Sequence, residues 1–70
     1  INTKSKVGMK MVVLRPNYIK PSVVAGKIKH LASQYSLITY DDKMDLLIIS
    51  DYPKNIKNMR KLLALFDTHL

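Results

Sequence analysis

The sequence contains no cysteine, no tryptophan and no glutamate, and it has only two glycines and one phenylalanine. Without cysteine, neither disulfide bonds nor a cysteine-ligated metal can stabilise the fold. Gly8 and Gly26 stand alone, which excludes a glycine-rich phosphate-binding loop. There is no run of 18 apolar residues, so the sequence predicts no membrane-spanning helix. The 70 residues, of which 47% are hydrophobic and 24% charged, are enough for one small globular domain.

The charge is strongly positive, with 12 lysines and arginines against 5 acidic residues and a formal net charge of +7. A basic domain can interact with nucleic acid, with anionic lipid or with an acidic protein. Only Arg15 and Arg60 are arginines, whereas specific recognition of phosphates and bases tends to use the arginine fork. A solvated, lysine-rich surface is therefore the simplest interpretation of the charge.

Apolar periodicity predicts the order strand, helix, strand, strand, helix. The expected strands span residues 9–14, 35–41 and 46–50, and the expected helices span 21–33 and 53–66. In the first strand, Lys10, Val12 and Leu14 share one face, which Lys10 suggests is partly wet, while Met11 and Val13 share the other. The expected buried positions of the helices are Val24, Ala25, Ile28, Leu31, Ala32, Ile56, Met59, Leu62, Leu63 and Phe66.

The third strand, Leu46–Ser50, is apolar on both faces, as expected of a central strand. A polar hairpin at residues 41–45 joins it to the second strand. Placing it between the other two gives a fully antiparallel sheet of order 1-3-2. Both helices then cover one face, so the predicted fold is a two-layer α+β sandwich of βαββα order. Residues 1–6 are predicted to be a linker and residues 7–68 a single domain. Because the chain begins at Ile1 rather than Met, we expect it to be part of a longer protein.

The sequence "LLIISDYPKNI", Leu46 to Ile56, leads from this strand directly into the last helix. A helix N-terminus can bind an anion, but no glycine here lets a ligand approach the backbone. We therefore predict that Asp51 caps the helix and that Pro53 occupies its first turn. Gly26, inside the first helix, is expected to allow close packing against a neighbouring element.

Signals for catalysis or metal binding are weak. Asp41, Asp42 and Asp45 cluster on the hairpin and could hold Ca²⁺, but their spacing is not that of an EF-hand and no glutamate completes the site. His30 and His69 are far apart and have no third ligand at metal-binding spacing. We predict that the chain is not an enzyme and has no cofactor, and that the hairpin is a solvated tip.

A basic βαββα domain also suggests the KH module, which grips the nucleic-acid backbone with a GXXG loop between two helices. This chain has no GXXG loop, and its first helix leads to a strand. Its first and third strands lack the aromatic residues of an RRM platform. A nucleic-acid-binding domain is thus the alternative rather than the preferred interpretation.

Residues 9–68 resemble the short repeated periplasmic domain of secretins, the N1-type module. The resemblance rests on the turn "RPNYIK" (Arg15–Lys20), on the alanine and leucine positions of the first helix and on the acidic hairpin. Its most specific part is "DLLIISDYPKNI" (Asp45–Ile56), although Asp45, Ser50 and Tyr52 depart from the family's usual Asn, Thr and Thr. Phe66-Asp67 also matches the end of the family's last helix.

The resemblance implies a KH-like fold without RNA binding, in a periplasmic domain of a Gram-negative outer-membrane channel. Type II secretion, type III secretion, type IV pili and phage export all use such channels. The implied role is non-catalytic: modules pack side by side into a homo-oligomeric ring and can dock inner-membrane or periplasmic components of the same machine. A related ring-forming domain outside the secretins is a further alternative. The isolated domain is expected to be monomeric or weakly associating.

The charge pattern supplies a hypothesis for such a ring. The acidic hairpin would face a lysine row on the second helix of the next protomer, forming a head-to-tail contact. The candidate interface residues are Asp41, Asp42, Asp45, Lys54, Lys57 and Lys61.

Overall fold

The computed structural model describes residues 8–68. Its elements are β1 (Lys10–Leu14), α1 (Pro21–Ile28), a short 3-10 helix η1 (Lys29–Leu31), β2 (Leu37–Asp41), β3 (Leu46–Asp51) and α2 (Pro53–Phe66). The predicted linker at residues 1–6, and His69, lie outside the described residues. No helix in the described part is both long and apolar enough to cross a membrane.

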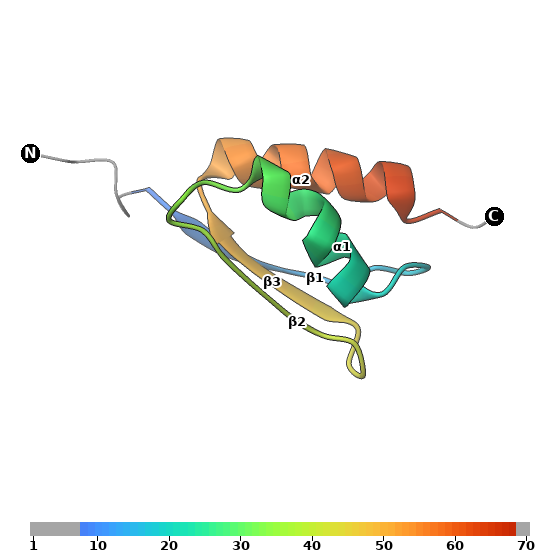
Figure 1. The fold of residues 1–70 in the computed structure, drawn as a ribbon. Helices are drawn as coiled ribbons and strands as arrows, with labels where there is room; N and C mark the ends of the chain where they lie inside the picture. Colours follow the sequence, from blue (N-terminus) through green and yellow to red (C-terminus); the bar gives the residue numbers. More distant parts are fainter. Residues whose placement is uncertain (1–7, 69–70) are drawn as a thin grey trace, which may run out of the picture.

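The three strands form one antiparallel sheet in the order β1-β3-β2, which confirms the predicted topology. The register places Val12 of β1 and Ile38 of β2 on either side of Ile49, the middle of the central strand. Both helices lie on the same face of this sheet (Figure 1). The two-layer βαββα fold expected from the apolar pattern is therefore confirmed, and no helix or strand among residues 8–68 covers the other face of the sheet.

The core lies between the sheet and the two helices. Its buried apolar residues come from α1, β3 and α2: Val24, Ala25, Ile28, Leu47, Ile49, Ile56 and Met59. Pro21 and Pro53 stand in the first turns of α1 and α2, where the missing N–H of proline leaves no intrahelical hydrogen bond unmade. The helix stripes predicted from periodicity account for most of this core.

The prediction that the Lys10, Val12 and Leu14 face of β1 is partly wet is wrong for Val12 and Leu14. Val12 lies opposite Ile49 and Leu14 lies opposite Leu47, and both partners on β3 are completely buried. Residues opposite each other in a sheet share a face, so Val12 and Leu14 point to the core. Met11 and the other odd-numbered side chains of β1 point to the uncovered face.

The first helix ends earlier than predicted. Regular α-helix stops at Ile28, and the 3-10 turn η1 ends at Leu31 rather than at Ser33. The Ala32 N–H still bonds to the Lys29 carbonyl at 3.2 Å, but the Ser33 N–H donates to the carboxylate of Asp51 at 3.0 Å. The helix ends here because Ser33 finds a charged acceptor on β3 instead of a helix carbonyl.

The prediction that Phe66 is buried is wrong. The side chain is 44% exposed at the last turn of α2. It lies against α1, where the Lys27 ammonium is 4.3 Å from the centre of the Phe66 ring, a cation–π contact. The end of α2 is thus held beside α1.

Candidate interaction surfaces

The predicted acidic cluster lies at the β2–β3 turn, and two of its carboxylates are engaged within the molecule. Asp42 accepts hydrogen bonds from the Ser22 backbone N–H at 2.9 Å and from the Ser22 hydroxyl at 2.7 Å. Asp41 accepts from the Lys43 backbone N–H at 2.9 Å. Asp45 is exposed and has a positive φ of 54°, a conformation that aspartate tolerates in tight turns. The turn is therefore fastened to the start of α1.

The pKa of Asp42 is lowered from its ordinary value by the Ser22 hydroxyl first and by the Ser22 N–H second. Both groups stabilise the ionised carboxylate. Asp42 thus stays charged at neutral pH but already has partners.

The predicted lysine row lies on α2. Lys54, Lys57 and Lys61 are all exposed, and their spacing places them on one side of the helix. The acidic turn is at the start of β3, whereas α2 begins just after the end of β3, so Lys54 and the turn are at opposite ends of the strand. No hydrogen bond or ion pair within residues 8–68 joins the acidic turn to the lysine row.

Asp51 does not cap α2 in the predicted way. Tyr52 is the N-cap residue, and α2 has no side-chain cap hydrogen bond. The carboxylate of Asp51 is instead completely buried and accepts from the N–H groups of Ser33, at 3.0 Å, and Tyr52, at 2.7 Å, and from the Asn55 side-chain amide at 3.2 Å. Asp51 therefore joins the end of β3, the loop after η1 and the first turn of α2.

Burial alone would raise the pKa of Asp51, but the hydrogen bonds from Ser33, Tyr52 and Asn55 outweigh it and lower the pKa below the ordinary value. The carboxylate is thus held in its charged form. No buried side-chain nitrogen or oxygen in the described residues lacks a partner. We interpret Asp51 as a structural anchor rather than as a catalytic acid.

Asp67 forms a second anchor, which the sequence did not reveal. Its carboxylate accepts hydrogen bonds from the backbone N–H groups of Asn17, at 2.8 and 3.0 Å, and of Tyr18. Burial raises its pKa, whereas the amides of Asn17, Tyr18 and Ile19 lower it, and the net direction is down. The residue after α2 therefore holds the loop between β1 and α1.

The sheet face opposite the helices is the largest feature that sequence reasoning assigned incorrectly. Its exposed apolar side chains are Met11 (67% exposed), Val13 (54%) and Leu37 (58%). Val13 lies opposite Ile48, and Met11 and Leu37 flank Ser50 from the two outer strands. Together these five residues form what we term the open sheet face. The pairing register shows which strand residues lie on this face and which point to the core.

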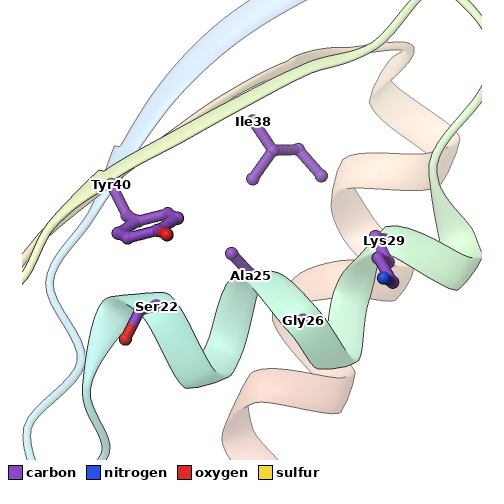
Figure 2. Close-up of a pocket in the computed structure, with 6 residues that line it drawn as sticks. All are labelled: Ser22, Ala25, Gly26, Lys29, Ile38 and Tyr40. Carbon is purple, nitrogen blue, oxygen red and sulfur yellow. The ribbon is translucent and has the colours of Figure 1, made fainter.

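A second feature is a groove between α1 and β2, with a volume of about 300 Å³. Figure 2 shows Ile38 and Tyr40 pointing from β2 toward Ala25 on α1. The complete lining is Ser22, Ala25, Gly26, Lys29, Ile38 and Tyr40. The prediction that Gly26 permits close packing is not met within the described residues, because a Cβ added there would meet no atom within 4 Å. Gly26 therefore borders open space in the groove.

Groups that could hold a metal ion are absent from the described residues, where no three His, Cys, Asp or Glu side chains cluster suitably. His30 is exposed on η1.

Comparison with known proteins found similar solved structures but no matching sequence family. No protein-family model and no curated protein matches the sequence. The extra-membranous domain of the secretin HofQ from Actinobacillus actinomycetemcomitans matches 86% of the chain, with a TM-score of 0.76 and 28% identity. The structure of XcpQN012 matches 90% of the chain, with a TM-score of 0.79 and 22% identity, which shows the fold alone. The matches span 46% of the HofQ chain and 30% of the XcpQN012 chain, so this chain covers less than half of either.

The match to HofQ, with a TM-score of 0.76 over 86% of the chain, indicates a shared fold. It agrees with the resemblance carried by "DLLIISDYPKNI" (Asp45–Ile56). The chain is therefore similar in structure to the extra-membranous domain of a secretin, and it shares its βαββα fold with XcpQN012.

Proposed function

We propose that this chain is a periplasmic, ring-forming domain of an outer-membrane secretin channel in a Gram-negative bacterium. The likeness to the extra-membranous domain of HofQ supports this location. The chain spans under half of that structure. We therefore propose, rather than observe, its place in a ring, in a channel and in the export of a cargo. The channels for which it is proposed are those of type II or III secretion, type IV pili and phage export.

The open sheet face carries this proposal. A three-stranded sheet with helices on one side leaves its other side to water unless another molecule covers it. Here that side exposes the apolar side chains of Met11, Val13 and Leu37, with Thr39 and Ser50 as polar neighbours. Contiguous apolar surface of this kind marks interaction sites in soluble domains. A neighbouring copy of the same domain is the partner that a secretin ring would supply.

The surface that the neighbour would offer lies at the ends of the helices. Val23 is 45% exposed, and Leu65 and Phe66 are 73% and 44% exposed. The contact between Lys27 and Phe66 joins α1 and α2 at this place, and Val23 is one helical turn before Lys27. Two different patches, one on the sheet and one on the helices, produce a head-to-tail contact, which forms a ring when the rotation between successive copies closes.

The charge clusters would lie at the rim of this contact, where they set register more than affinity. Asp42 and Asp41 already have hydrogen-bond partners in the protomer, whereas Asp45 is exposed. We therefore propose that Asp45 contributes most to pairing with Lys54, Lys57 and Lys61 of the next copy. Docking of inner-membrane or periplasmic components of the machine is a further part of the proposal.

The nucleic-acid alternative receives no support from the arrangement of the strands. Tyr40 is the only aromatic residue in β1, β2 and β3, and it points toward α1 rather than to the open sheet face. The open sheet face therefore has no side chain on which a base could stack.

Cysteine cross-linking in the secretin that carries this domain tests the ring directly, since the chain has no cysteine of its own. Val13→Cys combined with Phe66→Cys should give a ladder of covalent multimers under oxidation. Each single variant should stay monomeric on a denaturing gel, because a head-to-tail contact never places the same residue opposite itself. Dimers from a single variant, or no ladder from the double variant, would contradict the proposed contact.

A charge variant gives an independent check. Met11→Glu with Val13→Glu should reduce ring yield in electron micrographs, whereas Gln34→Glu, at an exposed loop position, should not. Because Met11 and Val13 are exposed, the isolated chain should keep its helical circular dichroism. Rings formed by the double variant at the unmodified level would refute the role of the open sheet face.

A further inference from the structure

We propose that the groove between α1 and β2 binds an extended, acidic segment of a partner protein, which adds to the sheet as a fourth strand beside β2. This site is separate from the open sheet face and does not depend on ring formation. The proposal rests on a free strand edge, an apolar groove beside it and the distribution of charge.

The free edge belongs to β2. The sheet order β1-β3-β2 leaves β2 paired with β3 on one side only, and no other strand among residues 8–68 occupies its second side. In an antiparallel pair, alternate residues direct their N–H and C=O groups away from the partner strand. Leu37–Asp41 therefore presents main-chain donors and acceptors that an incoming strand can pair with.

The groove gives such a strand a place for its side chains. An added strand lies in the plane of the sheet, so every second side chain of it would point toward the helix layer. Ile38 and Tyr40 on β2 and Ala25 on α1 supply an apolar wall (Figure 2). Gly26 widens the groove, because its missing Cβ would project into empty space.

No other structural role of Gly26 is evident within residues 8–68. A glycine in a helix interior destabilises the helix by about 1 kcal/mol relative to alanine. Its φ is not in the left-handed region, and no neighbouring element approaches it. Packing within the described residues gives no reason for a glycine at position 26. Space for the side chain of a bound partner would give one.

The charges identify the kind of segment. Lys29 lines the groove, and no hydrogen bond or ion pair within residues 8–68 engages its ammonium group. The chain as a whole carries a net charge of +7, so an acidic segment is attracted at long range as well. A carboxylate on the bound strand, placed near Lys29, complements this end of the groove.

The partner is a different protein rather than a second copy. Asp41, Asp42, Asp51 and Asp67 all bind donors within this chain, which leaves Asp45 among the five acidic residues. A second copy therefore has little negative charge to offer. RNA is disfavoured because Lys29 is the only cation in the lining, too few for a row of backbone phosphates. Asp41 and Asp42 lie just beyond the Tyr40 end of the groove, so the acidic residues of the bound segment belong at the Lys29 end.

The test begins with a phage-displayed library of random 12-residue peptides selected on the 70-residue chain. Enriched peptides should combine acidic residues with alternating apolar residues. A synthetic copy, titrated into the ¹⁵N-labelled chain, should shift the amide signals of Leu37–Asp41 and of α1 in NMR spectra. N-methylation of alternate peptide amides should weaken binding by about tenfold or more, because it removes the inter-strand hydrogen bonds.

Two pairs of variants separate the groove from the rest of the surface. Gly26→Leu should fill the groove and weaken binding by about tenfold, while Gly26→Ala, with a smaller side chain, should weaken it less. Lys29→Glu should weaken binding of the acidic peptide. Arg60→Glu, an equal change in net charge at an exposed position of α2, should leave affinity nearly unchanged. Circular dichroism of each variant checks that the fold is retained.

Several outcomes would overturn the proposal. These are failure of any peptide to enrich, signal shifts confined to the open sheet face or to α2, and binding that is insensitive to N-methylation or to Gly26→Leu. Tighter binding of a 12-nucleotide oligouridylate in the same groove at moderate salt would show that the site is for RNA instead.

Discussion

Replacement of Asp51 by alanine is the most direct test of how this fold is held together. The carboxylate connects three segments that are distant in the chain, since it accepts hydrogen bonds from Ser33, Tyr52 and Asn55. Alanine removes the carboxylate, so these three donors lose their hydrogen-bond acceptor. We expect Asp51→Ala to destabilise the domain far more than a typical substitution of a surface aspartate.

The magnitude follows from the contacts. A hydrogen bond contributes about 1 kcal/mol net, and one to a charged group about 1.5 to 3 kcal/mol. Ser33, Tyr52 and Asn55 are half-buried, so water can partly replace the lost partner. We therefore use about 1 kcal/mol for each of the three hydrogen bonds. The sum is about 3 kcal/mol. For a domain of this length the total free energy of unfolding is about 4 to 10 kcal/mol, so the melting temperature should fall by about 12 to 24 °C.

Urea unfolding followed by circular dichroism measures this change. Asp51→Asn is the matched variant, because it keeps the shape and one oxygen but turns an NH₂ group toward at least one of the N–H donors. We expect it to lose about 2 kcal/mol. Both variants should have the same m-value as the original chain, since the same surface is exposed on unfolding.

The dependence on pH gives a second readout. The pKa of Asp51 is lower in the folded protein than its ordinary value of 3.8. Its contribution is therefore present above about pH 4 and is lost as the pH falls through the lowered pKa. Asp42 and Asp67 have lowered pKa values as well, so the original chain loses stability through all three. Asp51→Ala should lose less free energy of unfolding than the original chain between pH 6 and pH 3.

The reasoning would be refuted by a loss of less than about 1 kcal/mol for Asp51→Ala, which is the usual effect of a single neutral hydrogen bond. An unchanged pH dependence in that variant would also contradict the charged state assigned to the buried carboxylate.

Two further predictions concern α1 and the end of α2. Gly26→Ala should raise the free energy of unfolding by about 1 kcal/mol in the absence of any partner, because alanine favours the helix and its Cβ meets no atom; a destabilised variant in urea unfolding would contradict the open space beside Gly26. Asp67→Ala should lower stability by about 1 kcal/mol and speed hydrogen exchange at Asn17 and Tyr18, since their N–H groups lose the carboxylate; unchanged exchange at both amides would show that the anchor is weak.

Much of the fold could be predicted because the apolar pattern is unambiguous where a strand is buried on both faces. Leu46–Ile49 is such a segment, and placing it in the centre of the sheet was enough to obtain the order β1-β3-β2. The prolines at 21 and 53 marked both helix starts correctly. The core positions Ile56 and Met59 followed from helical spacing.

The remaining errors have physical causes. Met11 and Val13 are as apolar as Val12 and Leu14, so alternation alone could not show which pair faces the helices. That choice depends on the register with Leu47 and Ile49. The sequence predicts Asp51 as a helix cap and gives no sign of its bond to Ser33, which is distant in sequence.

The candidate sites were predictable only in part. The sequence located the acidic turn and the lysine row correctly on the hairpin and on α2, but it could not show that Asp42 is bound to Ser22. The groove has one signal in the sequence, a glycine inside a helix, and that signal does not reveal which strand lies beside it. Their roles in ring formation and in peptide binding stay predictions.

The strand order also determines when the sheet can form. Among residues 8–68 the two outer strands pair only with β3, which follows both of them, so neither has this partner until Leu46–Asp51 has been synthesised. The β2–β3 hairpin closes a short loop, whereas pairing of β1 requires closure over residues 15–45, which carries a larger entropic penalty. Assembly of the hairpin before the docking of β1 is therefore the expected folding sequence. By the same reasoning, β1 is the strand that separates first when the native domain opens.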